Sequence, residues 1–124
     1  MRDIKFRGKI KNLKVNKWVY GYLADECHIS EKNELGYTPI RKETVGQYTG
    51  LKDKNETEIY EGDIVQSDID RALVKWNDKY GYFQLVPIGD YYFDSDVIGQ
   101  ALEYADVEVI GNIYDNLELL EEGE

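Results

Sequence analysis

The chain has 124 residues, a length that fits a single domain with a buried core. It contains one cysteine, Cys27, which excludes an intrachain disulfide, and it has no long apolar run of the kind that crosses a membrane. No signal peptide is recognised, so the expected location is the cytoplasm. The net charge of −10 disfavours non-specific contact with DNA or with an anionic membrane.

Positive charge is concentrated at the start of the chain. Residues 1–17 hold seven bases and one acid, for +6, whereas residues 18–124 hold eight bases and 24 acids, for −16. We expect the basic stretch to pair with acidic neighbours, within the chain or across a subunit boundary, and therefore predict a homo-oligomer. A second hypothesis is that this stretch binds nucleic acid through its cations. The candidate contacts are Arg2, Lys5, Arg7, Lys9 and Lys11.

The first forty residues predict β-structure. In residues 4–7 apolar side chains alternate with basic ones, as in a strand with one buried face. Residues 18–23 form the next strand, and the two make an N-terminal hairpin over residues 3–24. Shorter strands are expected at 28–29 and 37–40, on either side of a polar loop.

A central β core is expected over residues 37–87. It contains a hairpin whose turn, at 52–55, has Asp and Asn residues that bond to their own backbone. Gly62 follows as a tight corner, because glycine adopts positive φ at little cost. Trp76, and Trp18 before the core, lie in alternating apolar runs and are expected to be buried. The expected strands are 45–48, 58–60, 63–67, 72–76 and 82–86, and their tight connections indicate a small, partly open SH3-like barrel.

Helix is expected only near the end of the chain. Apolar side chains at helical spacing predict a short helix over 96–105, with Ser95 as its N-cap. A strand follows at 108–114, and a final helical turn is expected at 117–121. The C-terminal part is therefore a helix and a strand over residues 95–121. The fold class is mainly β, with small antiparallel sheets and one or two short helices, in a single domain over the whole chain.

One segment combines aromatic and acidic residues. Three adjacent aromatic side chains cannot all point into one core, so at least one is expected at the surface as a contact for a protein partner. These are Tyr91, Tyr92 and Phe93. The acids around them offer oxygen ligands to a hard cation, but their spacing misses that of a calcium loop, and a solvated loop is the preferred interpretation. These are Asp90, Asp94 and Asp96.

Other chemistry-bearing residues do not form a recognisable site. Glu61 and Asp63 would share a strand face, as a carboxylate pair for acid–base chemistry requires, but a turn bonded to backbone amides explains them better. Cys27 and His28 are adjacent, and adjacent strand residues point to opposite faces, which disfavours a thiol–imidazole pair. His28 also has no second histidine for a metal set. We therefore expect no catalytic residue, cofactor or metal site, which argues against an enzyme without excluding one.

Two glycine-centred blocks carry a family resemblance. The first reads Val-Gly-Gln-Tyr-Thr-Gly-Leu-Lys-Asp-Lys-Asn at 45–55 and continues as Ile-Tyr-Glu-Gly-Asp-Ile-Val at 59–65. The second reads Val-Ile-Gly-Asn-Ile-Tyr-Asp-Asn at 109–116. With Arg-Asp-Ile-Lys-Phe-Arg-Gly at 2–8, Trp-Val-Tyr-Gly at 18–21 and Val-Lys-Trp at 74–76, the chain resembles the YopX family over nearly its whole length. It departs from the family pattern at Glu56, where the family often has glycine, and this difference affects the type of turn.

The resemblance implies an intracellular, mainly β protein encoded by a bacteriophage or prophage. The family is described without a known activity, so it transfers no catalytic residue to this chain. We therefore expect a non-enzymatic binding or interaction protein that acts on a protein partner in the cytoplasm of the host cell. The alternative is a nucleic-acid-binding protein that uses the basic start of the chain. A metal-dependent enzyme that uses the acidic segment or the Glu61 and Asp63 pair is the third hypothesis.

Overall fold

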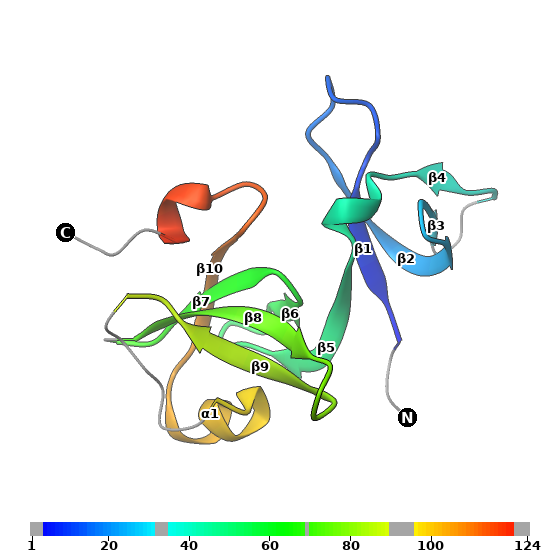
Figure 1. Cartoon of the computed structure of the whole chain (residues 1–124). Coiled ribbons are helices and arrows are strands. Elements are labelled where there is room, and N and C mark those ends of the chain that lie inside the picture. Colours follow the sequence, from blue (N-terminus) through cyan, green and yellow to red (C-terminus); the bar gives the residue numbers. More distant parts are fainter. Residues whose placement is uncertain (1–3, 32–34, 69, 90–95, 121–124) are drawn as a thin grey trace. The chain divides into compact units, whose positions relative to one another are not determined.

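The computed structural model describes residues 4–31, 35–68, 70–89 and 96–120 (Figure 1). These residues form strands, one α-helix and two short 3₁₀ helices, so the mainly β class predicted from the sequence is confirmed. The chain divides into two compact units, residues 1–50 and residues 51–124. A single domain over the whole chain stays a prediction.

The first unit is an antiparallel sheet built around the basic strand. Its strands are β1 (Phe6–Lys9), β2 (Trp18–Asp25), β3 (His28–Glu31), β4 (Thr38–Pro39) and β5 (Gly46–Lys52), which ends within the second unit. They follow the order β4-β3-β2-β1-β5, and the 3₁₀ helix η1 (Lys42–Thr44) precedes β5. The core consists of Val19, Ile29 and Ile40, each at most 1% exposed. A Cβ atom at Gly21 would stand 2.2 Å from the Ser30 carbonyl oxygen, so only glycine fits where β2 meets β3.

The second unit packs a helix and a four-stranded sheet around its own core. Its elements are β6 (Glu58–Tyr60), β7 (Asp63–Gln66), β8 (Arg71–Asn77), β9 (Tyr82–Pro87), α1 (Ile98–Tyr104), β10 (Glu108–Asn112) and the 3₁₀ helix η2 (Leu117–Leu120). The sheet has the antiparallel order β10-β7-β8-β9, and β6 is the neighbour of β5. The buried core residues are Ile59, Val65, Ala72, Val74, Leu85, Ile98, Ala101 and Val107. Helix α1 contributes two of them because its apolar side chains recur at helical spacing.

Several details of this unit refine the sequence predictions. The helix expected at 96–105 is confirmed as α1, but its N-cap is Val97. Ser95, the predicted cap, lies outside the described residues. The final turn expected at 117–121 is η2. The described strands form two open sheets and no closed barrel, so an SH3-like arrangement of the central strands stays a prediction.

The burial predicted for Trp76 is wrong. This side chain is 42% exposed, although Ala72 and Val74 on the same strand are fully buried. Trp76 is on the same face of β8 but lies near the end of the strand, beyond the buried core residues. It packs edge-on against its cross-strand partner Phe83, with the ring centroids 4.9 Å apart.

One buried carboxylate organises the turn between β5 and β6. Asp53 is 4% exposed. Its Oδ1 accepts hydrogen bonds from the backbone N–H groups of Asn55 and Thr57, at 2.8 and 2.9 Å. Its Oδ2 accepts a third from the backbone N–H of Val109 in β10, at 2.8 Å. The side chain therefore closes its own turn and fastens β10 to it.

Replacement of this carboxylate by an amide is expected to weaken the second unit. Asp53→Asn keeps one acceptor oxygen but turns an amide NH₂ group toward a backbone N–H, so one buried donor loses its partner. We expect the free energy of unfolding to fall by about 2–3 kcal/mol, measured by urea denaturation. Asp78→Asn, which makes the same charge change at an exposed aspartate, serves as the control and should stay within about 0.5 kcal/mol of the wild type. Equal stability of the two variants would contradict this role of Asp53.

The same turn contains a residue in left-handed conformation. Glu56 has a φ of 65°, and its backbone N–H donates to the Asp53 carbonyl oxygen at 3.0 Å. A residue with a Cβ atom is strained in this region, whereas glycine is not. Glycine would therefore suit this position of the turn better than Glu56 does.

Glu56→Gly is expected to stabilise the protein. Relief of the left-handed strain stabilises the folded protein by more than the extra conformational entropy of glycine stabilises the unfolded chain. We therefore expect the free energy of unfolding to rise by about 0.5–1 kcal/mol. Glu56→Ala, which retains a Cβ atom, is the control and should give no such gain. The measurement is urea denaturation of both variants, and a glycine variant no more stable than the alanine variant would rule out strain at this position.

Candidate functional site

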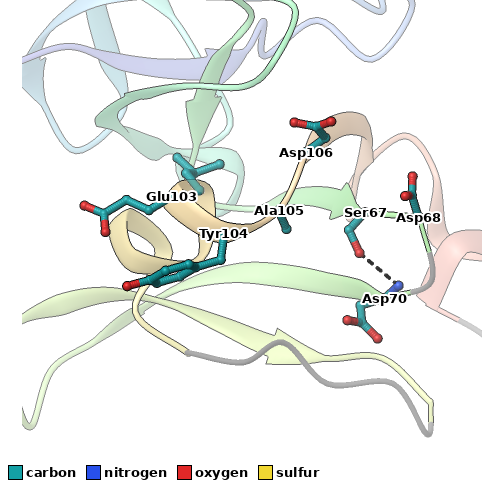
Figure 2. A pocket seen from close by; sticks show the side chains of 8 residues that line it. Ser67, Asp68, Asp70, Glu103, Tyr104, Ala105 and Asp106 are labelled. Atoms are coloured by element: carbon teal, nitrogen blue, oxygen red, sulfur yellow. Dashed lines mark hydrogen bonds between the residues drawn. The ribbon is translucent and has the colours of Figure 1, made fainter.

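The second unit has a pocket lined by acidic, other polar and apolar side chains. Its volume is about 560 Å³. One wall is the turn between β7 and β8, and the other is the end of α1 with the residues that follow it (Figure 2). The lining residues are Ser67, Asp68, Asp70, Leu102, Glu103, Tyr104, Ala105 and Asp106.

Short-range hydrogen bonds shape both walls of this acidic pocket. In the β7–β8 turn, the backbone N–H of Ser67 donates to the Asp70 carbonyl oxygen at 2.8 Å, and the backbone N–H of Asp70 donates to Ser67 Oγ at 3.1 Å. On the other wall, the backbone N–H of Ala105 donates to the Ala101 carbonyl oxygen at 3.1 Å and ends the helix. Figure 2 shows the Glu103 and Tyr104 side chains extending from the helical wall. The carboxylates are therefore presented by two locally fixed segments.

The chemistry of the acidic pocket suits an organic cation. Its lining includes four carboxylates and no base, and the ring of Tyr104 is 75% exposed. Among the residues that the structure describes, these carboxylates form no group of three close enough to hold one metal ion. Separated carboxylates beside an aromatic ring instead suit an ammonium or guanidinium group, because the face of an exposed tyrosine ring also attracts such a cation.

Charge divides along the boundary between the units. Residues 1–50 hold ten bases and six acids, a net charge of +4, and residues 51–124 hold five bases and 19 acids, a net charge of −14. The acidic pocket therefore lies in the strongly anionic unit, whose field favours a cationic partner.

The aromatic partner contacts predicted from the sequence, Tyr91, Tyr92 and Phe93, lie outside the described residues. Asp90 and Asp94 lie outside them as well. Asp96 is described, and its Oδ2 accepts hydrogen bonds from the Tyr82 hydroxyl at 2.9 Å and from Gln84 Nε2 at 3.4 Å. The bond to Asp96 raises the pKa of the Tyr82 phenol above its ordinary value. Asp96 thus joins the start of the helical segment to β9. The solvated loop preferred for this acidic segment, over a bound cation, stays a prediction.

Two cations of the basic strand are buried in the first unit. Arg7 is 6% exposed and Lys9 is 7% exposed. The Arg7 guanidinium carbon lies 4.5 Å from the centre of the Trp18 ring, and Lys9 Nζ lies 5.7 Å from it. Lys5 Nζ lies 5.2 Å from the centre of the Tyr48 ring. These side chains pack on aromatic rings, an arrangement that leaves Arg7 and Lys9 little surface for a phosphate.

Three exposed cations of the first unit lie in the loop between β1 and β2. All residues from 11 to 17 are exposed, and three of them are lysines: Lys11, Lys14 and Lys17. Only Lys11 belongs to the set of nucleic-acid contacts predicted from the sequence. Arg2, another member of that set, lies outside the described residues.

The Glu61 and Asp63 pair is part of a turn. Asp63 is 2% exposed, and its Oδ2 accepts a hydrogen bond from the backbone N–H of Tyr60 at 2.7 Å. Gly62 between them has a φ of 94°, which only glycine adopts without strain. This geometry supports a turn bonded to backbone amides in preference to an acid–base pair.

Sequence reasoning missed a cluster at the turn between β2 and β3. The carboxylate of Asp25 accepts the backbone N–H of Cys27 at 2.9 Å, and the same oxygen lies 2.8 Å from His28 Nδ1. One ligand atom from each of the three side chains lies within 4.8 Å of the others. The rule of opposite strand faces does not apply to the Cys27 and His28 pair, because Cys27 is a turn residue. A hairpin turn signal at 25–28 would have indicated this convergence.

Comparison with known proteins yields one family. The family model described as YopX protein matches residues 3–121 of the chain. No curated protein matches it. Within the part of the chain that the structure describes, no helix combines the length and the apolar character needed to cross a bilayer.

The contacts of Asp25 generate a pH prediction. The hydrogen bond from the Cys27 backbone, and then the contact with His28, hold the pKa of the Asp25 carboxyl below its ordinary value. Its folded form therefore binds a proton less readily than its unfolded form. The stability that this carboxylate contributes should be present above the ordinary aspartate pKa and lost as the pH falls through the folded value.

Carboxyl chemical shifts followed by NMR across an acid titration measure this pKa directly. His28→Ala should raise the Asp25 pKa only part of the way to its ordinary value, because the larger cause, the Cys27 N–H bond, remains. An Asp25 pKa that does not respond to the loss of His28 would refute the contribution of the imidazole.

Proposed function

This chain belongs to the YopX family, and on that basis we propose that it is a non-enzymatic binding protein of a bacteriophage or prophage that acts in the host cytoplasm. Its partner is a protein with a segment rich in lysine or arginine, and the acidic pocket takes that segment. The observation that carries the proposal is a pocket with four carboxylates, an exposed tyrosine ring and no base.

The dimensions and charge of the acidic pocket support such a partner. A volume of about 560 Å³ lies within the range of about 300–1,000 Å³ typical of ligand pockets. Lysine and arginine side chains are long enough to reach the carboxylates while their stems lie against Leu102 and the Tyr104 ring. The net charge of −14 on residues 51–124 would also speed the encounter with a basic segment.

A fluorescent oligo-arginine peptide provides the first test. We expect it to bind the full chain, by fluorescence anisotropy, with an affinity that falls as salt is raised. The double variant Asp68→Asn and Asp106→Asn should bind about tenfold more weakly. The control, Asp78→Asn with Glu118→Gln, removes the same charge from exposed positions outside the pocket and should stay within about twofold of the wild type.

Equal weakening by the two double variants would overturn the proposal, because it would show attraction to the charge of the unit as a whole. Tyr104→Leu separates the aromatic contribution, with Tyr80→Leu as its control at another exposed tyrosine of the same unit. A peptide that binds the pocket variant as tightly as the wild type would exclude the pocket altogether.

The opposite charges of the two units support self-association as a second part of the proposal. The +4 of residues 1–50 in one copy would attract the −14 of residues 51–124 in another. Light scattering at low and high salt measures it, and a monomer under both conditions contradicts it.

The exposed lysine loop favours nucleic-acid binding as the second candidate function. Lys11, Lys14 and Lys17 present three cations on one loop of the cationic unit. Electrophoretic shift of single- and double-stranded probes at low salt, with all three lysines replaced by glutamine as the comparison, tests it. Absence of a shift for the wild type would eliminate this candidate.

A further inference from the structure

We propose that the turn between β2 and β3 is a binding site for one Zn²⁺ ion, held by the Asp25 carboxylate, the Cys27 thiolate and the His28 imidazole. This site lies in the first unit and is independent of the acidic pocket. It combines three different ligand types, which distinguishes it from a group of surface acids. All three are ligand types that zinc sites in proteins use.

The three ligand atoms lie within side-chain reach of the separations that a zinc ion needs. Bonds of about 2.0–2.3 Å in tetrahedral geometry place neighbouring ligand atoms about 3.3–3.6 Å apart. In the structure, one ligand atom from each side chain lies within 4.8 Å of the others, and the Asp25 Oδ1 to His28 Nδ1 distance is 2.8 Å. The two side chains are 58% and 39% exposed, so rotation of side chains alone can adjust these separations.

The backbone holds the turn in place while the side chains adjust. The Cys27 carbonyl oxygen accepts the backbone N–H of Ile40 at 2.9 Å, and Ile40 is a core residue of the unit. His28 pairs with Pro39 of β4, and Asp25 pairs with His28 across the hairpin. Neither contact of the Asp25 carboxylate uses Oδ2, so this oxygen can approach a metal while Oδ1 keeps the Cys27 N–H bond.

The donor set selects zinc over the common hard cations. Magnesium and calcium prefer all-oxygen sites, whereas a thiolate with an imidazole suits Zn²⁺. Three protein ligands leave the fourth tetrahedral position to water or to a donor from a partner. Binding displaces the thiol proton to solvent and leaves the imidazole proton on Nε2, with Nδ1 on the metal.

The test uses the full chain after removal of metal by a chelator. We expect one equivalent of Zn²⁺ to bind, by elemental analysis after dialysis, and to raise the melting temperature. Co²⁺ in place of Zn²⁺ should give a thiolate-to-cobalt charge-transfer band, which reports the Cys27 ligand directly. Cys27→Ser, His28→Gln and Asp25→Asn should each lower the zinc affinity by at least about tenfold.

The matched control is Glu26→Gln. Glu26 is an exposed acid in the same turn, outside the group of three, so its loss should leave the zinc affinity unchanged. Asp25→Asn keeps an oxygen acceptor for the Cys27 N–H, so the turn persists and loss of zinc in this variant reports the missing carboxylate.

Three results would overturn the site. They are a melting temperature that Zn²⁺ leaves unchanged, a cobalt complex without the thiolate band, and Glu26→Gln weakening zinc binding as much as Asp25→Asn does. The oligo-arginine affinity of the chain should be the same with and without zinc, so the result does not depend on the acidic pocket.

Discussion

The second unit depends on one buried carboxylate. Asp53 accepts two backbone hydrogen bonds inside the β5–β6 turn and one from β10, which lies more than fifty residues further along the chain. A buried backbone N–H without an acceptor is costly in free energy. The same side chain therefore fixes both the turn and the position of β10 beside it. The glycine-centred block at 45–55 contains the residues that form this turn. The block at 109–116 begins with Val109, the residue of β10 whose backbone N–H donates to Asp53.

Local sequence signals predicted the fold where structure is decided by near neighbours. Alternating side chains indicated the strands, helical spacing indicated α1, and the Asp and Asn residues of 52–55 indicated the turn that Asp53 closes. The signals failed where burial depends on distant segments. Arg7 and Lys9 are of residue types that are usually exposed, yet both are buried and pack on the ring of Trp18 in the neighbouring strand β2.

The candidate sites were less accessible to sequence reasoning than the fold. The walls of the acidic pocket come from segments more than thirty residues apart, and nothing in either segment indicates the other. The cluster at the β2–β3 turn was missed for a different reason, because Cys27 was treated as a strand residue when it belongs to a turn.

The charge division gives the molecule two chemically different halves. In the cationic half, the buried cations Arg7 and Lys9 pack on the Trp18 ring, and three exposed lysines lie in the loop between β1 and β2. In the anionic half, the buried carboxylates of Asp53 and Asp63 accept hydrogen bonds from backbone N–H groups, and four other carboxylates line the acidic pocket. Buried charged residues thus serve structure, and exposed ones are available for the recognition that we propose.

The positions of the two tryptophans have an optical consequence. Trp18 lies in the first unit with its ring close to Arg7 and Lys9, and Trp76 lies in the second, half exposed and against Phe83. Each half of the chain therefore contains its own fluorophore in its own environment, one beside cations and the other beside a benzene ring and solvent. When excitation is restricted to tryptophan, the emission of the unlabelled protein is a sum of these two signals, and it can report the order in which the two halves lose their structure.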